Sequence, residues 1–260
     1  MSARIFVFDS GIGGLTILGA IQKRLGTGEY YYAFDNACYP YGTKSVSFLR
    51  KRVQTVISAL VQEANPDILV IACNTVSTFA LPMLRKIYSF PIVGVVPPLK
   101  PVCLISKSKK VAILGTEQTI QRKYVDDLIQ EYGNGCQVFK WGSSQLVALA
   151  EEKFYTGKNV LSEVRKEIES FDPDPDIDAV ALGCTHFPHL VAELSTLYPQ
   201  IQWMDPSAGV AHRVAVLLQE FVQQNSAITT TVFSTKKDAE THLDPWKNYH
   251  VKEFRFLSIS

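Results

Sequence analysis

The sequence has no excess of charge of either sign. Its 260 residues carry 26 Lys and Arg against 25 Asp and Glu, a formal net charge of +1. A nucleic-acid-binding domain normally has a clear basic excess, so this balance predicts no nucleic-acid partner. Disordered chains combine low hydrophobicity with high net charge, whereas 47% of these residues are hydrophobic. The composition therefore predicts a packed globular protein.

Long apolar runs are also missing. The longest, such as Ile68 to Cys73, fall far short of the roughly 18 residues that would span a bilayer. The first residues hold one Arg, a short apolar run and then Asp9, which is too short and too soon charged for a secretory signal. We therefore expect a cytoplasmic protein with no membrane partner.

Paired cysteines are absent as well. The five cysteines are odd in number, irregularly spaced and without a Cys-x-x-Cys pair, so neither a disulfide scaffold nor a zinc site is indicated. We expect Cys103 and Cys136 to be packing residues and Cys38 to lie in a partly exposed loop. The remaining two, Cys73 and Cys184, stand at the ends of short apolar runs, where thiols remain available for chemistry.

What the sequence does contain is an alternation of strand and helix patterns. The apolar runs at 68–72 and 179–182 are typical of strands buried on both faces of a parallel sheet. Helical patterns lie between such runs, for example over 15–25, 45–63, 78–88 and 208–223. The pattern predicts an α/β fold with mainly parallel sheets, in which sites collect beyond the carboxyl ends of the strands.

The chain also repeats itself. Ser10 and Cys73 are 63 residues apart, and Thr116 and Cys184 are 68 apart. Each span opens with a strand followed by a hydroxyl residue and closes with a strand followed by cysteine. We predict two pseudo-symmetric domains, residues 1–98 with 207–260 and residues 99–206, joined through the proline-rich PPLKP segment. Both cysteines would then face one interdomain cleft, with the strand-like tail returning to the first domain.

The two matched cysteines are the strongest candidates for chemistry. A thiol at the mouth of a buried strand can be held as a thiolate by nearby donors and helix N-termini, and a thiolate is a competent base or nucleophile. Either cysteine alone is more typical of a small buried hydrophobe. Their equivalent positions in the repeat favour the functional interpretation.

Other candidates lie beside these cysteines in the pattern. Asp9 and Ser10 end the first strand, before glycines that let backbone approach a ligand, although Asp9 could instead cap the next helix. The glycine-rich run lacks the spacing of a nucleotide site. His186 follows Cys184 by two residues. Glu151 stands where an acidic residue is most often a solvated surface charge, and Tyr41 lies in a proline-containing turn.

Taken together, the motifs resemble the cofactor-independent aspartate/glutamate racemase family. The resemblance covers roughly residues 4–225 and is carried by DSGIGGLT at 9–16, YPYGTKS at 39–45, ACNTVST at 72–78, GVVPPLKP at 94–101, LGT at 114–116 and LGCTHFPHL at 182–190. It implies interconversion of L- and D-glutamate, which supplies D-glutamate for bacterial peptidoglycan. Inverting a stereocentre needs one acid/base group on each face of the carbon, and two cysteines supply that symmetry.

The resemblance also implies residue roles. Cys73 would act on D-glutamate and Cys184 on L-glutamate, with Asp9 beside the first thiol and His186 and Glu151 beside the second. The remaining positions would hold the carboxylates and ammonium of the substrate: Ser10, Tyr41, Gly42, Asn74, Thr75 and Thr185, together with Asp9 and His186. The absence of a pyridoxal lysine motif or a metal cluster from the sequence predicts a reaction without cofactor or metal.

Three other functions stay open at this point. An aspartate racemase would use the same two thiols with a shorter pocket, although the full DSGIGGL and GCTHFP motifs favour glutamate. A non-catalytic amino-acid receptor would need neither thiol. A cysteine hydrolase would leave the second cysteine unexplained. The sequence leaves the oligomeric state open, a homodimer included.

Overall fold

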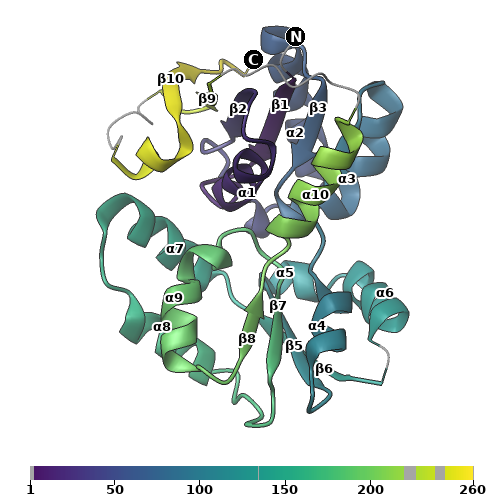
Figure 1. Ribbon diagram of the computed structural model, residues 1–260, viewed down its shortest axis with the longest axis vertical. Helices are drawn as coiled ribbons and strands as arrows, with labels where there is room; N and C mark the ends of the chain where they lie inside the picture. The colour runs from purple at the N-terminus through teal and green to yellow at the C-terminus, as the bar shows by residue number, and fades with distance from the viewer. Residues whose placement is uncertain (1–2, 134, 220–226, 238–243, 260) are drawn as a thin grey trace. The chain divides into compact units, whose positions relative to one another are not determined.

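The computed structural model describes residues 3–133, 135–219, 227–237 and 244–259. The chain divides into two compact units, residues 1–95 with 207–260 and residues 96–206. Each unit is built on its own sheet, labelled in Figure 1, and every strand pair in the described residues is parallel. The predicted α/β fold with mainly parallel sheets is confirmed. In the parts of the chain that the structure describes, no helix is long and apolar enough to cross a membrane.

The first unit contains a six-stranded sheet with the order β10-β9-β2-β1-β3-β4. Its strands are β1 (Arg4–Asp9), β2 (Glu29–Phe34), β3 (Ile68–Ile71), β4 (Ile92–Gly94), β9 (Thr229–Ser234) and β10 (Val251–Phe256). β1 lies between β2 and β3, and its residues from Ile5 to Asp9 are buried, as expected for an apolar run covered on both faces.

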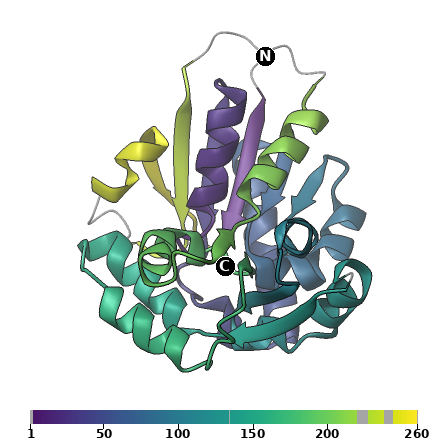
Figure 2. The ribbon, with the colours of Figure 1, turned by 60° about the horizontal axis from the view of Figure 1, so that its bottom comes forward.

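Helices pack on both faces of this sheet. They are α1 (Leu15–Leu25), α2 (Val46–Ala64), α3 (Asn74–Ile87) and α10 (Ser207–Leu217), with 3-10 helices η1 (Tyr41–Thr43) and η4 (Asp244–Tyr249). Alternate strand residues such as Phe6 and Phe8 form one core with Leu49 and Val53 of α2. α1 packs against α10, and the two helices are adjacent in both views of the first unit (Figures 1 and 2).

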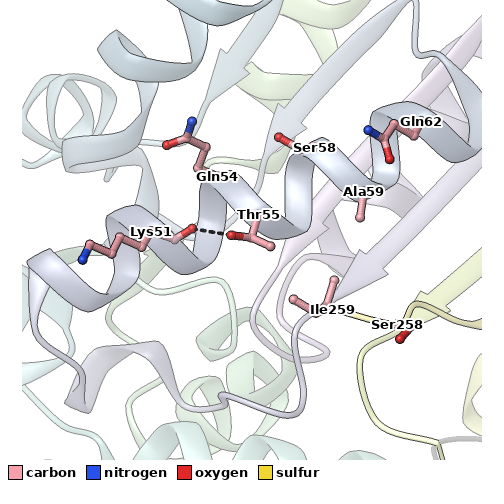
Figure 3. Close-up of a pocket in the computed structure, with 8 residues that line it drawn as sticks. All are labelled: Lys51, Gln54, Thr55, Ser58, Ala59, Gln62, Ser258 and Ile259. Carbon is pink, nitrogen blue, oxygen red and sulfur yellow. Dashed lines mark hydrogen bonds between the residues drawn. The ribbon is translucent and has the colours of Figure 1, made fainter.

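The C-terminal segment belongs to this sheet and then crosses α2. β9 pairs with β2, with Thr229 opposite Glu29, and β10 forms the sheet edge. Leu257 and Ile259 then pack against the core beneath α2. Between this tail and α2 lies a groove of about 480 Å³ (Figure 3). Its lining is mostly polar: Lys51, Gln54, Thr55, Ser58, Ala59, Gln62, Ser258 and Ile259.

The second unit contains a four-stranded sheet with the order β6-β5-β7-β8. Its strands are β5 (Lys110–Gly115), β6 (Gln137–Gly142), β7 (Ala179–Leu182) and β8 (Gln202–Met204). Its helices are α4 (Leu99–Ile105), α5 (Glu117–Ile120), α6 (Lys123–Tyr132), α7 (Gln145–Thr156), α8 (Leu161–Glu169), α9 (Val191–Leu197) and the 3-10 helix η2 (Phe187–Leu190). As predicted, Cys103 and Cys136 belong to its hydrophobic core, with Val111 and Ala179.

The internal repeat is visible in the strand order and register. The order β2-β1-β3-β4 of the first sheet recurs as β6-β5-β7-β8 in the second. Phe8 lies opposite Ile71 in the first, and Leu114 lies opposite Leu182 in the second. Ser10 and Cys73 each follow the first pair by two residues, and Thr116 and Cys184 follow the second pair in the same way. The repeat therefore places both cysteines at equivalent positions of equivalent strands.

Three sequence expectations need correction. The helix expected from residue 78 begins at Asn74, directly after the cysteine. The PPLKP segment is not an extended linker throughout, because α4 begins inside it at Leu99 and buries that side chain. Pro101 is tolerated in the first turn of α4, where its missing N–H has no helical partner to lose. The helix predicted over 208–223 spans Ser207–Leu217 and is followed by a turn at 218–219, and the predicted residues 220–223 lie outside the described residues.

Candidate active site

In the first unit, the register of β1 and β3 brings Ser10 and Cys73 out of the sheet side by side. The backbone N–H of Ala72 donates to the Phe8 carbonyl at 2.8 Å, which extends the pairing to the residue before the cysteine. Cys73 is buried and occupies the N-cap position of α3, where no side chain caps the helix. The first N–H groups of α3 therefore have no helical acceptor, and their partial positive charge favours an anion beside the thiol.

Asp9 is fully buried at the end of β1. Its Oδ1 accepts hydrogen bonds from the backbone N–H groups of Ser10 at 2.5 Å and Gly11 at 3.4 Å. It does not cap α1, because Gly14 occupies the N-cap position, so that alternative is wrong. A Cβ at Gly14 would lie 3.0 Å from the Cβ atoms of both Asp9 and Ala72. Glycine thus lets α1 approach the strand ends that carry the predicted site residues of this unit, which we call the first half-site.

Tyr41 is held by a buried ion pair that the sequence did not predict. Its hydroxyl donates to Asp35 Oδ2 at 2.6 Å, and Arg52 donates to the same carboxylate from Nε at 2.8 Å and Nη2 at 2.7 Å. Burial alone would raise the pKa of Asp35, but hydrogen bonds from Arg52, Thr235 and Tyr41 hold that pKa below its usual value. Burial, Asp35 and the charge of Cys73 raise the pKa of Tyr41 well above its usual value, so it is a neutral donor.

The sequence carries one signal for Asp35, which is a polar residue directly after a strand. Asp35 directly follows β2, as a polar side chain does after β1, and its N–H donates to the Asp9 carbonyl at 3.1 Å. Nothing in the sequence pairs it with Arg52, which lies 17 residues away on α2. Gly42 follows Tyr41 in η1 and is half-buried.

Asn74 is the least satisfied polar side chain of this half-site. It is 4% exposed, yet its Oδ1 and Nδ2 have no hydrogen-bond partner among the residues described. A buried amide without partners costs free energy unless a ligand supplies them. Thr75, which follows it in the first turn of α3, is also buried. Both amide atoms of Asn74 are thus available to a polar ligand.

The second unit arranges Cys184, His186 and Glu151 in a chain. Cys184 Sγ lies 3.9 Å from His186 Nδ1, and His186 Nε2 lies 2.8 Å from Glu151 Oε1. Burial lowers the pKa of His186, but Cys184 and Glu151 outweigh it and raise that pKa well above its usual value. The imidazolium form of His186 is therefore favoured, with the Cys184 sulfur on one side and the Glu151 carboxylate on the other.

Glu151 corrects a sequence expectation. As a solvated surface charge it would point away from the protein, but its side chain is only 15% exposed and faces the buried imidazole. Glu151 lies on α7. Because Glu151 and Cys184 are far apart in the sequence, apolar periodicity could not pair them. Thr185 is buried between the cysteine and the histidine.

The predicted residues therefore fall into two groups, one in each unit. The first contains Asp9, Ser10, Tyr41, Gly42, Cys73, Asn74 and Thr75, and the second contains Glu151, Cys184, Thr185 and His186. Cys38 is partly buried near Asp35, outside the residues predicted for either half-site. No group of three or more His, Cys, Asp or Glu side chains within the described ranges is arranged to hold a metal ion.

The fold and the two half-sites define a class of α/β enzyme in which a buried thiol ends one strand in each of two repeated units. The chain belongs to the Asp/Glu/Hydantoin racemase family, whose model matches residues 16–213, and it is an isomerase. It is 42% identical over 243 residues to the glutamate racemase of Actinobacillus pleuropneumoniae serotype 7, covering 92% of this chain and 91% of the relative.

Solved structures agree with this family. The glutamate racemase of Escherichia coli, in complex with L-glutamate and the activator UDP-MurNAc-ala, matches with a TM-score of 0.93 and 34% identity over 100% of both chains. The glutamate racemase isoform RacE1 of Bacillus anthracis matches with a TM-score of 0.85 and 25% identity, covering 99% of this chain and 98% of the other. The resemblance drawn from the sequence motifs is confirmed at the level of the family.

Proposed function

We propose that the protein interconverts L- and D-glutamate by moving the Cα proton between two cysteines. The observation that carries the proposal is the equivalent placement of Cys73 and Cys184, each two residues beyond a paired position of matching parallel strands. The relative at 42% identity and the structural match at a TM-score of 0.93 are both glutamate racemases, which supports glutamate as the substrate rather than aspartate.

Each thiol serves one face of the substrate carbon. With L-glutamate, the Cys184 thiolate takes the Cα proton and the Cys73 thiol delivers a proton to the opposite face. The product is D-glutamate, and the enzyme is left with a Cys184 thiol and a Cys73 thiolate. With D-glutamate the same two transfers run in reverse. The thiols then exchange protons with water, which returns the enzyme to its starting form.

The surroundings of the two thiols suit these roles. Cys73 stands at the N-terminus of α3, where the helix favours its anion, and Asp9 ends the neighbouring strand. Cys184 stands beside the His186 imidazolium, which Glu151 holds. Because the Cα proton of an amino acid is very weakly acidic, the developing carbanion needs electrostatic stabilisation in a site closed to water.

Small neutral donors would bind the substrate. The orphaned amide of Asn74, the N–H groups of the first turn of α3 and the hydroxyls of Ser10, Thr75 and Thr185 suit carboxylates. Backbone N–H groups at Tyr41 and Gly42 complete the set in the first unit, because the Tyr41 hydroxyl already donates to Asp35. We infer that the two units are the two domains of the enzyme, that both half-sites contact one glutamate, and that no cofactor or metal takes part.

We infer further that the product serves peptidoglycan synthesis in the cytoplasm, with glutamate as the small-molecule partner. This follows from the family alone, since D-glutamate is the product that such a reaction supplies. Sedimentation would measure whether the protein is a monomer or a homodimer.

The test is an assay without added cofactor on four proteins: wild type, Cys73→Ser, Cys184→Ser and Cys38→Ser. Wild type should convert either pure enantiomer to an equal mixture, measured by chiral chromatography, and use aspartate far less well. Each active-site substitution should slow racemisation in both directions by at least ~10²–10⁴-fold, the range typical of acid–base groups. Cys38→Ser is the control and should keep wild-type rates. Full activity in either active-site variant would exclude the two-cysteine mechanism.

A further inference from the structure

A lysine outside the predicted site ties α7 to the segment that follows Cys184. Lys153 Nζ donates to the backbone carbonyl of His189 at 2.8 Å and to Glu193 Oε2 at 2.7 Å. The lysine side chain is 29% exposed and that of Glu193 only 13%. The ammonium therefore joins three elements, since Lys153 lies on α7, His189 on η2 and Glu193 on α9.

This contact is one turn away from His186. The backbone N–H of His189 donates to the His186 carbonyl at 3.1 Å. The His189 carbonyl that Lys153 binds therefore belongs to the same short turn as His186. The ring of Phe154, the next residue on α7, also meets the His189 ring edge-to-face at 5.8 Å between centroids. α7 thus contacts this turn at Glu151, Lys153 and Phe154.

The need for such a tie follows from a difference between the two half-sites. Cys73 is followed at once by α3, a helix of 14 residues that fixes the backbone around it. Cys184 is followed by an irregular turn and then by η2, a 3-10 helix of only four residues. Short 3-10 helices have poorer hydrogen-bond geometry than α-helices, so they hold a backbone less firmly. The position of the second half-site therefore depends more on α7.

We propose that Lys153 is a positioning residue, whose ammonium clamps α7 to η2 and α9 and thereby sets the contact between Glu151 and His186. The proposal rests on the proposed role of Cys184 as the acid/base group for L-glutamate. Lys153 acts through position rather than charge, because Glu193 neutralises its ammonium. Cys184 lies on one side of the His186 ring and the Glu151 carboxylate on the other.

The clamp is tested by Lys153→Met, which keeps the length of the side chain and removes its hydrogen bonds. We expect kcat/KM to fall by about 10–100-fold, the loss that a small misplacement of a catalytic group produces. Lys153→Arg should recover most of the activity. Lys158→Met is the matched control, because Lys158 also pairs with α7, through Glu152 at 3.0 Å, and binds Glu163 at 3.3 Å, but touches neither η2 nor α9 by any described ion pair.

Isotope effects separate positioning from general destabilisation. At equilibrium the two enantiomers are equal, so kcat/KM must fall equally in both directions. With L-glutamate deuterated at Cα, Cys184 removes the deuteron, and slowing this step should raise the isotope effect on kcat/KM of Lys153→Met. With deuterated D-glutamate, Cys73 removes the deuteron, and the isotope effect should decrease toward the equilibrium value for deuteron transfer from carbon to a thiol. A variant that merely unfolds in part loses active enzyme and leaves both isotope effects at wild-type values.

A measurement without turnover completes the test. Nuclear magnetic resonance of protein with nitrogen-15-labelled histidine, with His186→Asn for assignment, reports the protonation of His186 directly. Its pKa should fall in Lys153→Met and stay unchanged in Lys158→Met. Unchanged isotope effects together with an unchanged His186 titration would overturn the clamp. Failure of the wild-type enzyme to racemise glutamate would contradict the proposed function instead, and the titration would still decide whether Lys153 positions His186.

Discussion

At the scale of single residues, the first unit depends on the buried pair of Asp35 and Arg52. The Asp35 side chain is fully buried and that of Arg52 is 17% exposed. Removing one partner of such a pair leaves a buried charge without compensation, which typically costs about 3–5 kcal/mol. We therefore expect Arg52→Met to lower the free energy of unfolding by that amount at pH 7, measured by urea denaturation. Arg4→Met removes a half-exposed pair with Asp67 and should cost ~1 kcal/mol or less.

The pH dependence of this pair has a definite sign. The folded-state pKa of Asp35 is lowered, so its ionised form contributes stability above the unfolded-state pKa of about 3.9, and that contribution is lost as the pH falls below it. In Arg52→Met the neutral acid is the better tolerated form of the buried carboxyl. The difference in unfolding free energy between wild type and Arg52→Met should therefore shrink as the pH falls from 7 toward 4. An equal difference at both pH values would show that Arg52 acts through packing alone.

Replacing Asn74 should change stability and activity in opposite directions. Its buried amide has no partners among the described residues, so the free protein carries a desolvation cost of about 1–3 kcal/mol that substrate would relieve. Asn74→Leu, similar in size, should raise the free energy of unfolding while lowering kcat/KM by at least ~100-fold. The control is Ser77→Ala on the same helix. Ser77 Oγ donates to the Ile71 carbonyl and accepts from Val95 N–H, each at 3.0 Å, so its removal should destabilise the protein.

At the scale of secondary structure, the approach of α1 to the strand ends depends on Gly14. Its φ of −66° is open to any residue, so the requirement comes from space and not from backbone conformation. An added Cβ would lie 3.0 Å from the Cβ atoms of Asp9 and Ala72 and 3.1 Å from Cε2 of the Tyr32 ring, which is buried and held by a hydrogen bond from its hydroxyl. We expect Gly14→Ala to cost about 1–3 kcal/mol by overpacking and to lower activity, because the strand ends that it would push carry Asp9 and Cys73.

Gly19 offers the comparison on the same helix. Among the described residues, a Cβ there would meet only the Tyr249 ring, at 3.5 Å, which is ordinary contact. Gly19→Ala should therefore leave activity unchanged and raise stability by up to ~1 kcal/mol through helix propensity. Equal urea midpoints for the two alanine variants would contradict the packing role of Gly14.

The elements that the sequence predicted well are those with a strong local signal. The helix Leu15–Leu25 and the strand Ala179–Leu182 have the expected bounds, because apolar periodicity and glycine boundaries mark both. The start of α3 was misplaced because Cys73 supplies no recognisable capping side chain. Asp35, Arg52 and Lys153 were missed for another reason. Their partners are distant in sequence, and local patterns carry no information about such pairings.

At the scale of the whole molecule, the two units differ in how the chain builds them. The second is one continuous stretch, residues 96–206, whereas the first needs both 1–95 and 207–260. The difference matters for the first sheet, in which β2 lies between β1 and β9. Without the C-terminal segment, β2 would lose one neighbour, and the Gln22 amide would lose the Thr230 hydroxyl that it reaches at 2.8 Å.

These connections predict opposite behaviour for two fragments. Residues 96–206 contain a complete four-stranded sheet and a core formed by Val111, Ala179 and Ala181, so this fragment should fold alone and unfold in one cooperative urea transition. It should not racemise glutamate, because it lacks Cys73. Residues 1–95 should show no cooperative transition, since removal of β9 and α10 exposes one edge of β2 and the face of α1 that α10 covers. Circular dichroism and the dispersion of amide proton shifts measure both outcomes. An unfolded 96–206 fragment would show that this unit is not an independent domain, because its own core would then be insufficient to offset the entropy of ordering the chain.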